Sequence, residues 1–517
     1  MKAAVAPEFK EGAKPVLSLK PEAPANANHW KDLPFAVAFV VHVLVVFVLM
    51  CALGVPLLKK DVAAIASATS SSSTVTTPVV APNSGFSSDD MKTVLEVAAV
   101  LAVVASLVAF VMFNLVINNA KFVISFTLWF NFVLNIAFAL FAIVAGIPVV
   151  AVIFFLLGLM AMCYRCFVRK RIPFAAANLQ VGAAAVQQHY FVFPLAYALI
   201  VVQLIWIVVW AIALVGVATK VAPTNPNTNG TGFGTNCTLP KDCLSNVCGH
   251  TNSTTIGTTC LSPVAGGQVV VLFFMLVSFY WGITVIKNVL HTTVAGTVAT
   301  WWVAGSNARG VTTGAFRRAT TTSFGSVCFG SLIVAILQTL ELIAKESLKQ
   351  GDWVACVAQC ILSCLRGIME YINRWAFIYV GIYGYTFMEA GKHVFTLFHN
   401  RGLTAIVNDD LIGIALTFVS LASGVICGAL GLAYATLDPA HASFSGAKVV
   451  FPILGLAFGI GVTLVPLSIV DSAVATVFVC FAEDPSAFAR SHPELHNTMV
   501  DAWRVAHPDA MMAFYPA

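Results

Sequence analysis

The chain alternates about ten apolar stretches of bilayer-spanning length with short segments that hold nearly all of its charge. A helix rises about 1.5 Å per residue, so about 20 apolar residues are needed to cross about 30 Å of hydrocarbon. The repeated pattern predicts an all-α, polytopic integral membrane protein. Composition agrees, because 59% of the 517 residues are hydrophobic and only 10% are charged, too few charges to solvate a soluble surface of this size.

The apolar stretches give a provisional map of spans and domains. We expect spans near residues 34–57, 93–117, 122–145, 147–164, 191–218, 268–303, 323–344, 374–396, 410–434 and 449–472. They leave an N-terminal tail over 1–33, a transmembrane domain over 34–482 and a C-terminal tail over 483–517. Extracellular loops are expected near 58–92 and 219–265. Within residues 345–373, the semi-apolar stretch 354–365 is interpreted as an interfacial or re-entrant helix.

Basic residues give the expected orientation. The N-terminal tail is rich in lysine and proline and has no long apolar core, which is not the pattern of a cleavable signal peptide. Arg165, Arg169 to Arg171, and Arg317 with Arg318 lie beside spans, where Lys and Arg mark the cytosolic side. Both termini are therefore expected in the cytosol of a multi-pass plasma-membrane protein. The net charge of +5 is spread over such small groups, so nucleic acid is not expected as a partner.

The polar segment 219–265 carries signs of an oxidising compartment. It holds four cysteines and three glycan acceptor patterns, at Cys237, Cys243, Cys248 and Cys260 and at Asn229, Asn236 and Asn252. Four cysteines in a short loop are typical of two disulfides, in one of three possible pairings. The alternative is that the acceptor patterns arise by chance and the cysteines stay reduced.

Residues 269–302 form the most informative span. They contain no proline, and as one straight helix they would be about 51 Å long, so this segment must tilt, break or leave the membrane. Polar, aromatic and small side chains share one helical face: Trp281, Asn288, Thr292, Ala295, Ala299 and Trp302, with His291 at its border. Such a face either packs against a neighbouring helix or lines a transport path.

Four blocks in the second half resemble a known family. Residues 286–302 (IKNVLHTTVAGTVATWW) resemble the "NVxHxTxAGTxAxWY" segment of the choline transporter-like (solute carrier 44) family, and residues 324–335 (FGSVCFGSLIVA) resemble its "GSxxFGSLIxA" helix. Residues 372–384 resemble its "xNRxAYxxxAIYG" segment, and residues 470–484 resemble its "VDxxFxCFxED" pattern. Residues 408–410 and 492–495 look more like its fungal and protist branch. The resemblance implies a transporter of choline or a related cation.

A quaternary ammonium has no hydrogen-bond donors, so its site requires aromatic faces with a carboxylate or dipole nearby. Trp281 and Trp302 border the polar face, and Tyr379 and Tyr383 belong to an aromatic series in another expected span. Ionisable residues within or at the ends of expected spans need partners: Glu341, Glu370, Arg374, Glu389, Lys392 and Asp471. Glu389 is three residues before Lys392 and four before His393, so a local helical pair is the default explanation. Proton coupling through His291 or Glu389 is a further hypothesis.

These observations favour a secondary transporter of a small organic cation, with choline first, that works by alternating access. The expected substrate-binding residues are Trp281, Asn288, His291, Thr292, Trp302, Tyr379, Tyr383 and Glu389. The alternatives are a transporter of ethanolamine or a thiamine derivative, and a non-transporting membrane scaffold. No motif of an enzyme is found, and no cofactor or metal is expected. The expected partners are the cation and the bilayer, and the sequence specifies no oligomeric state.

Overall fold

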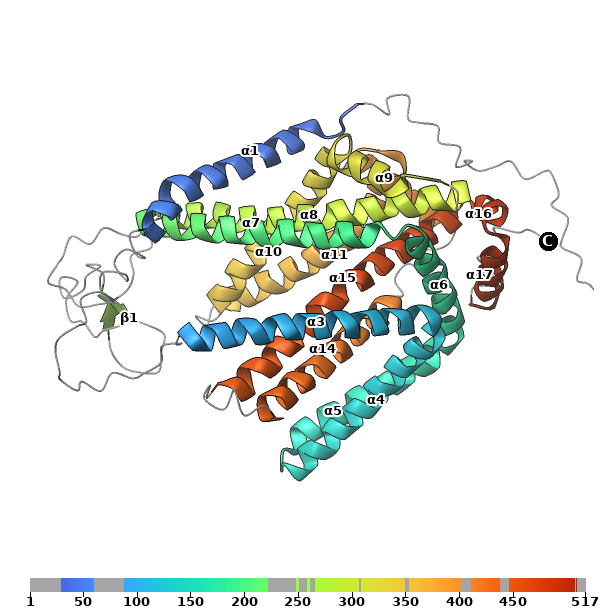
Figure 1. Cartoon of the computed structure of the whole chain (residues 1–517), viewed down its shortest axis with the longest axis horizontal. Helices are drawn as coiled ribbons and strands as arrows, with labels where there is room; N and C mark the ends of the chain where they lie inside the picture. Colours follow the sequence, from blue (N-terminus) through green and yellow to red (C-terminus); the bar gives the residue numbers. More distant parts are fainter. Residues whose placement is uncertain are drawn as a thin grey trace, which may run out of the picture.

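The computed structural model describes residues 29–59, 88–221, 248–250, 258–260, 266–305, 308–348, 353–400, 411–437, 446–506 and 508. Its longer elements are α1 (Leu33–Leu49), α3 (Ser88–Asn118), α4 (Ala120–Val144), α5 (Pro148–Val168), α6 (Ile172–Gln188), α7 (Val192–Val221), α8 (Gly266–Ala304), α10 (Phe324–Leu348), α11 (Trp353–Tyr383), α14 (Leu411–Leu437) and α15 (Ala447–Glu483). Shorter helices are α9 (Val311–Thr320), α12 (Phe387–Asn400), α16 (Pro485–Ser491) and α17 (Pro493–Ala506). The chain is thus an all-α bundle (Figure 1).

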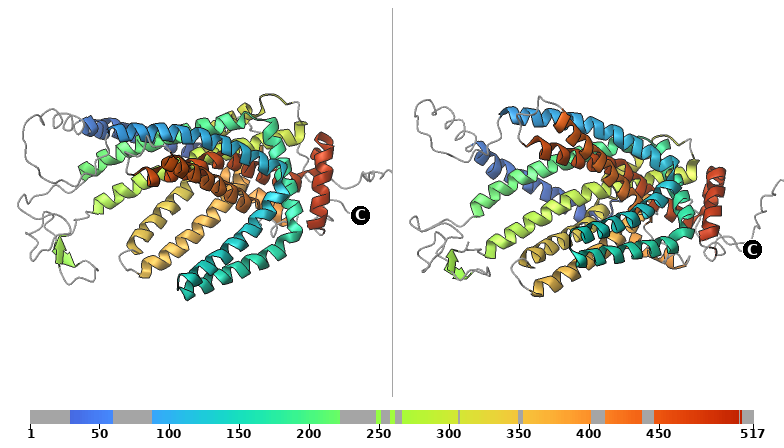
Figure 2. Two further views of the ribbon diagram at one scale, coloured as in Figure 1. Left: turned by 60° about the horizontal axis from the view of Figure 1, so that its bottom comes forward. Right: turned by 90° about the horizontal axis from the view of Figure 1, so that it is seen from below.

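Within this part of the chain, 10 helices are long and apolar enough to cross a membrane. Successive spans run in opposite directions along the bundle (Figure 1). We call the end where α1 begins and α15 finishes the tail side, and the opposite end, where α7 finishes and α8 begins, the far side. Helices α6, α9, α16 and α17 gather on the tail side (Figure 2). Charged residues group there in the 3-10 turn Arg169–Arg171 and in α9, which carries Arg317 and Arg318.

The eighth span differs from the sequence expectation. The structure places it at Trp353–Tyr383, not at 374–396, so the stretch interpreted as interfacial or re-entrant is the first part of a spanning helix. Gly384 ends α11 with a φ of 68°, a left-handed conformation that glycine adopts without steric cost. The chain then starts a separate, amphipathic helix, α12. Arg366 and Glu370 consequently belong to the middle of a spanning helix.

Two segments that lie outside the expected spans are helical. Residues between the fourth and fifth spans form α6, which is buried over most of its length against its neighbours. The expected C-terminal tail contains α16 and α17. Asp484 caps α16, because its Oδ1 accepts the N–H of Ala487 at 3.1 Å and Pro485 occupies the first turn. Trp503 of α17 is fully buried, and its ring lies 4.5 Å from that of Phe481 on α15.

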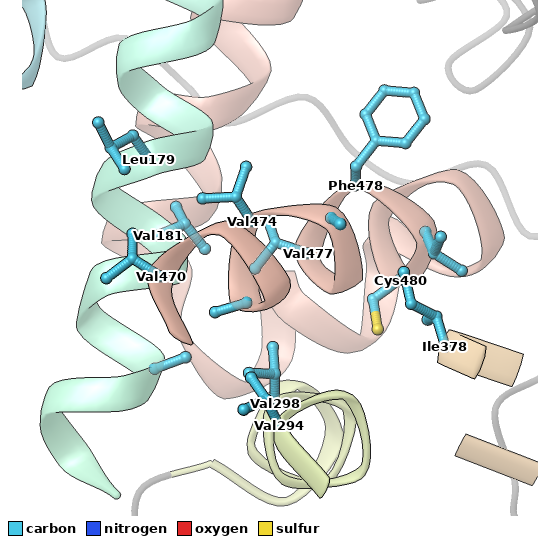
Figure 3. Close-up of a cluster of buried hydrophobic side chains, with 14 of the residues drawn as sticks. Leu179, Val181, Val294, Val298, Ile378, Val470, Val474, Val477, Phe478 and Cys480 are labelled. Carbon is cyan, nitrogen blue, oxygen red and sulfur yellow. The ribbon is translucent and has the colours of Figure 1, made fainter. Parts of the chain in front are cut away.

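The largest apolar cluster lies where α6, α8, α11 and α15 meet. Figure 3 shows Val181 of α6, Val298 of α8 and Ile378 of α11 around the valines of α15. Helix association inside a bilayer depends on close packing of this kind more than on the exclusion of water. This cluster fixes the position of α8, α11 and α15, the three helices that hold most of the polar groups considered next.

Candidate functional site

The polar face of α8 is a packing face in this structure. α8 is unbroken from Gly266 to Ala304, and the members of the predicted face are all buried, with at most 8% of each residue exposed. Trp281 Nε1 donates to the carbonyl of Cys328 on α10 at 3.0 Å, and Asn288 Nδ2 donates to Ser331 Oγ at 2.9 Å. Thr292 is 2% exposed. Trp281 and Asn288 thus join α8 to α10, which corresponds to the first of the two interpretations of the face.

His291 connects three helices. Its Nε2 lies 2.8 Å from the carbonyl oxygen of Arg374 on α11, and its Nδ1 lies 2.8 Å from Ser472 Oγ on α15. A carbonyl can only accept, so Nε2 carries the proton and Nδ1 accepts from the serine. Arg374 Nη2 in turn lies 2.8 Å from Asp471 Oδ1. Two of the ionisable residues noted in the sequence therefore pair with each other across α11 and α15.

Trp302 and Glu389 each contact neighbouring groups of the protein. Trp302 is fully buried, its indole donates to the carbonyl of Asp484 at 3.0 Å, and its ring stacks on Phe488 at 4.0 Å. Glu389 lies at the start of α12, where its carboxylate accepts the backbone N–H of Thr386 at 3.2 Å. Hydrogen bonds from Thr386 lower the pKa of Glu389. The structure therefore gives Glu389 a capping contact with Thr386 in place of the expected ion pair with Lys392.

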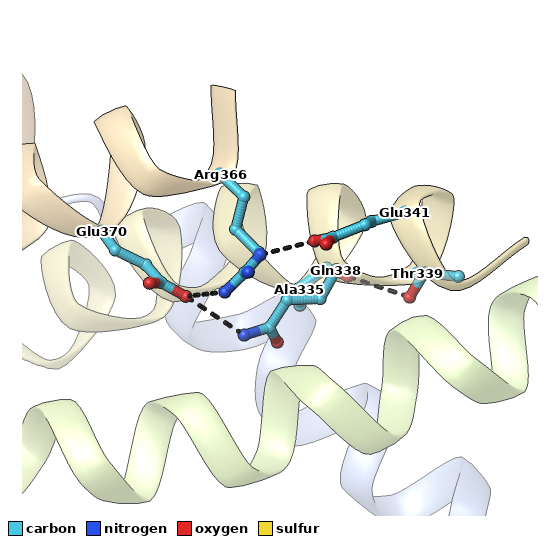
Figure 4. A network of polar contacts seen from close by, with 6 residues as sticks. All are labelled: Ala335, Gln338, Thr339, Glu341, Arg366 and Glu370. Carbon is cyan, nitrogen blue, oxygen red and sulfur yellow. Dashed lines mark hydrogen bonds and ion pairs between the residues drawn. The ribbon is translucent and has the colours of Figure 1, made fainter. Parts of the chain in front are cut away.

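The middle of α10 and α11 carries a polar network formed by Gln338, Glu341, Arg366 and Glu370, which we call the midspan network (Figure 4). Arg366 Nε lies 2.6 Å from Glu341 Oε2, and Arg366 Nη1 lies 3.0 Å from Glu370 Oε1. Gln338 Nε2 lies 3.4 Å from the same Glu370 oxygen. One arginine thus holds two carboxylates, so the ionised network has a net charge of −1.

The midspan network lies near the middle of two candidate spanning helices and is partly open. Arg366 and Glu370 lie symmetrically about the midpoint of α11, and Gln338 lies close to the midpoint of α10. The side chains of Glu341, Arg366 and Glu370 are 20%, 30% and 43% exposed. A charged residue at the centre of a spanning helix costs about 2.5 to 3.5 kcal/mol in lipid, so such groups normally face protein, water or a substrate.

The tail-side ends of α11 and α15 bring aromatic rings to a buried carboxylate. Tyr379 Oη donates to Glu483 Oε2 at 3.0 Å, and the Tyr383 hydroxyl lies close enough to the same carboxylate to interact with it. The ring of Tyr385 lies 5.3 Å from that of Tyr383 and 6.4 Å from that of Tyr379. We call Tyr379, Tyr383, Tyr385 and Glu483 the tyrosine–glutamate cluster. It combines two predicted residues with the two kinds of group that a quaternary ammonium requires.

A cavity of about 760 Å³ lies between α1, α7, α8 and α10. Trp281 lines it beside His42, whose ring stacks on the indole at 4.9 Å and whose Nε2 lies 2.8 Å from Ser278 Oγ. The remaining lining is apolar except for Lys220. No carboxylate is among these lining residues, so the cavity is less suited to a cation than the two carboxylate sites.

Sequence reasoning missed several residues of these sites. Arg366 was assigned outside the spans because the eighth span was placed about 20 residues too late. Glu483 lies inside the family-like block 470–484, and Tyr385 directly follows the block 372–384. Only the fold shows that the two residues are close together. His42 is a lone polar residue in the first apolar stretch, and that is the signal by which it could have been found.

The structure describes only short parts of the segment 219–265. Asn229, Asn236, Asn252, Cys237 and Cys243 lie outside the described residues. The short antiparallel strands β1 (Cys248–His250) and β2 (Thr258–Cys260) place Cys248 opposite Cys260 in the backbone register. The disulfides and glycans remain predictions. Among the described residues, no group of three or more His, Cys, Asp or Glu could hold a metal ion.

Comparison with known proteins decides the family. A family model described as plasma-membrane choline transporter matches residues 152–486. The chain belongs to this choline transporter family. The match covers all four sequence blocks and every residue of both carboxylate sites.

Individual relatives agree with this assignment. A CTL-like protein of Dictyostelium discoideum is 28% identical over 393 residues, which are 74% of this chain and 62% of that protein. The chain thus spans less than two thirds of that relative. Protein PNS1 of Mycosarcoma maydis is 29% identical over 403 residues, 76% of this chain and 70% of that protein. Similarity to fungal and slime-mould proteins confirms the branch that the sequence indicated.

Proposed function

We propose that this choline transporter family member carries a small organic cation, choline first, across the plasma membrane by alternating access. The observation that supports the proposal most is the midspan network. It places two carboxylates and one guanidinium in the middle parts of two spanning helices, and transporters of many folds bind their substrates near the bilayer midplane. Its net charge of −1 complements one quaternary ammonium.

Glu370 is the proposed counterion for the substrate. It is the most exposed of the three charged side chains, at 43%, while Glu341 is at 20%. Arg366 would hold both carboxylates ionised and in place, as an arginine does when it donates to two acids. Gln338 would offer its amide to the hydroxyl of choline, since the amide already lies beside Glu370.

The tyrosine–glutamate cluster is proposed as the cytosolic end of the path. The tail side carries Arg169 to Arg171 and the arginines of α9, and the bias of Lys and Arg toward the cytosol supports this orientation. At that end Tyr379 and Tyr383 supply aromatic faces, and Glu483 supplies a carboxylate. The cation would then pass between two sites of similar chemistry.

Uptake into proteoliposomes tests the proposal. Labelled choline is supplied outside vesicles that contain the purified protein, with unlabelled ethanolamine and thiamine as competitors. We expect saturable uptake that choline inhibits best. In Glu370→Gln the KM should rise about tenfold, because a charge-assisted contact contributes about 1.5 kcal/mol or more.

Glu494→Gln is the matched control, because Glu494 is a carboxylate in the first turn of α17, outside the spans, and its KM should stay unchanged. If ethanolamine or thiamine inhibits better than choline, the cargo assignment is wrong. The scaffold alternative gains support if the folded protein transports none of these cations in either direction.

A further inference from the structure

Asp32 joins three helices on the tail side. It lies directly before α1, and its Oδ2 accepts the hydroxyl of Ser326 on α10 at 2.7 Å and the backbone N–H of Phe387 on α12 at 2.9 Å. The neighbouring Lys31 N–H donates to the carbonyl of Thr322 at 2.8 Å. One carboxylate thus connects segments that are 294 and 355 residues apart in the chain. We call this arrangement the Asp32 contact.

The backbone at this point is adapted to the contact. Asp32 has a φ of 50°, and within the described residues it is the one non-glycine residue with a positive φ. Asp tolerates this conformation better than most residues, but the conformation is sparsely populated and needs support from its surroundings. On the partner side, a Cβ at Gly325 would lie 2.3 Å from the carbonyl oxygen of Asp32. The segment before α1 and the start of α10 therefore approach this closely only because residue 325 is glycine.

The contact leads directly to the tyrosine–glutamate cluster. Ser326 Oγ lies 2.7 Å from Asp32 Oδ2 and 3.3 Å from the carbonyl oxygen of Tyr385. A hydroxyl has a single proton to donate, and the shorter distance shows that Asp32 is its main acceptor. Tyr385 follows Gly384, the residue at which α11 turns into α12. Asp32 thus holds the α12 side of this corner through the N–H of Phe387, and Ser326 lies between Asp32 and the backbone of Tyr385.

We propose that the Asp32 contact keeps the cytosolic end of the transport path closed and opens in each transport cycle. This inference rests on the proposed function for its direction, but its geometry stands independently. When Asp32 releases Ser326 and Phe387, α1 separates from α10 and the α11–α12 corner is free to rotate at Gly384. Movement of that corner withdraws Tyr383 and Tyr385 from Glu483 and exposes the carboxylate to the cytosol. A residue that only capped α12 would leave Glu483 and its neighbours unaffected.

The chain contains its own reporter of this opening. Cys480 lies one helical turn before Glu483 on α15 and is 1% exposed, so a thiol reagent reaches it only when the cytosolic end opens. Cys427 on α14 is fully buried as well and has no part in the Asp32 contact, so it serves as the internal control. Alkylation of both thiols by N-ethylmaleimide is followed by peptide mass spectrometry, on the full-length protein in lipid nanodiscs without substrate.

The expected result is graded. In Asp32→Ala, Cys480 should be alkylated about tenfold faster than in the unmodified protein, as expected when hydrogen bonds to a charged group are lost. Asp32→Asn keeps an acceptor oxygen and the left-handed conformation, so its rate should fall between the two. Ser326→Ala, which removes one of the two donors, should also accelerate alkylation. Cys427 should react at the same rate in all four proteins.

Two outcomes would overturn the inference. Unchanged alkylation of Cys480 in Asp32→Ala would show that the contact does not hold the cytosolic end closed. An equal rise at Cys427 would show general loss of packing. Because the measurement contains no substrate, it succeeds or fails independently of choline uptake, so failure of the transport proposal is recognised separately.

Discussion

Arg374 Nη2 lies 2.8 Å from Asp471 Oδ1, and the carbonyl oxygen of the same arginine accepts a hydrogen bond from His291 at 2.8 Å. The guanidinium and the main chain of one residue therefore join α11 to α15 and to α8. Three spanning helices are held together at a single level of the bundle. This level lies one helical turn from Glu370, so the pair and the midspan network are neighbours on α11.

The Arg374 to Asp471 pair should be coupled energetically. Asp471→Asn leaves the guanidinium with one fewer negative partner, and we expect a loss of about 2 kcal/mol, less than for a fully buried pair because both side chains are partly exposed. The double variant Arg374→Gln with Asp471→Asn should recover part of this loss. Thermal unfolding of the four proteins in one detergent gives the coupling free energy. Simple addition of the two single effects would show that the pair contributes nothing.

Close approach of α11 to α8 should depend on Gly381. A Cβ at this position would lie 2.6 Å from the carbonyl oxygen of Thr292, so Gly381→Ala should destabilise the protein by about 1 to 3 kcal/mol. Gly367→Ala on the same helix is the matched control, because nothing lies within 4 Å of its Cβ. That variant should be neutral or up to about 1 kcal/mol more stable, since alanine favours helix. Equal effects of the two changes would contradict the packing argument.

The hydroxyl of Tyr379 should matter for transport more than for folding. Tyr379→Phe keeps the ring and removes the donor to Glu483, while the Tyr383 hydroxyl stays near the carboxylate. We expect about a tenfold lower rate of choline uptake, of the size that one charged hydrogen bond contributes. Tyr190→Phe, at a residue that is 73% exposed, should transport normally. An unchanged rate in Tyr379→Phe would remove this cluster from the path.

Acid should weaken the docking of the C-terminal helices. Burial lowers the pKa of His492 and of His496 below the ordinary value of 6.5. Well above pH 6.5 both rings are neutral in the folded and unfolded states. Below that pH the unfolded state takes up protons that the folded state does not, so stability is lost as the pH falls. Unfolding temperatures between pH 7.5 and 5 should decline less when the two histidines are replaced by Asn and Gln. A parallel decline would exclude this cause.

Periodicity and hydropathy were enough to predict the all-α class and nine of the ten spans. They also predicted that Trp281, Asn288 and Thr292 share a face of α8, because that depends only on 3.6 residues per turn. The eighth span was wrong because its limits depend on the left-handed Gly384, and an apolar run on both sides of a glycine does not reveal where a helix ends. Because the expected span began at residue 374, Arg366 was not recognised as a residue of a spanning helix.

Partners across helices were beyond sequence reasoning for a different reason. Glu341 and Arg366 are 25 residues apart, and Tyr379 and Glu483 are 104 residues apart. Local spacing predicts which residues share a face of one helix, but it carries no information on which face another helix presents. The need of Glu341 for a partner could be predicted from the cost of its charge. The identity of that partner required the fold.

α8 is a stiff rod of 39 residues, about 58 Å long and thus about twice the hydrocarbon thickness. Its tail-side end holds Trp301 and Trp302 against Phe488 of α16. If α8 tilts about its middle as a rigid helix, its two ends move by equal distances in opposite directions. The contacts of Trp301 and Trp302 with Phe488 then carry the movement of the tail-side end to α16. A probe attached to α16 would therefore register a tilt of α8.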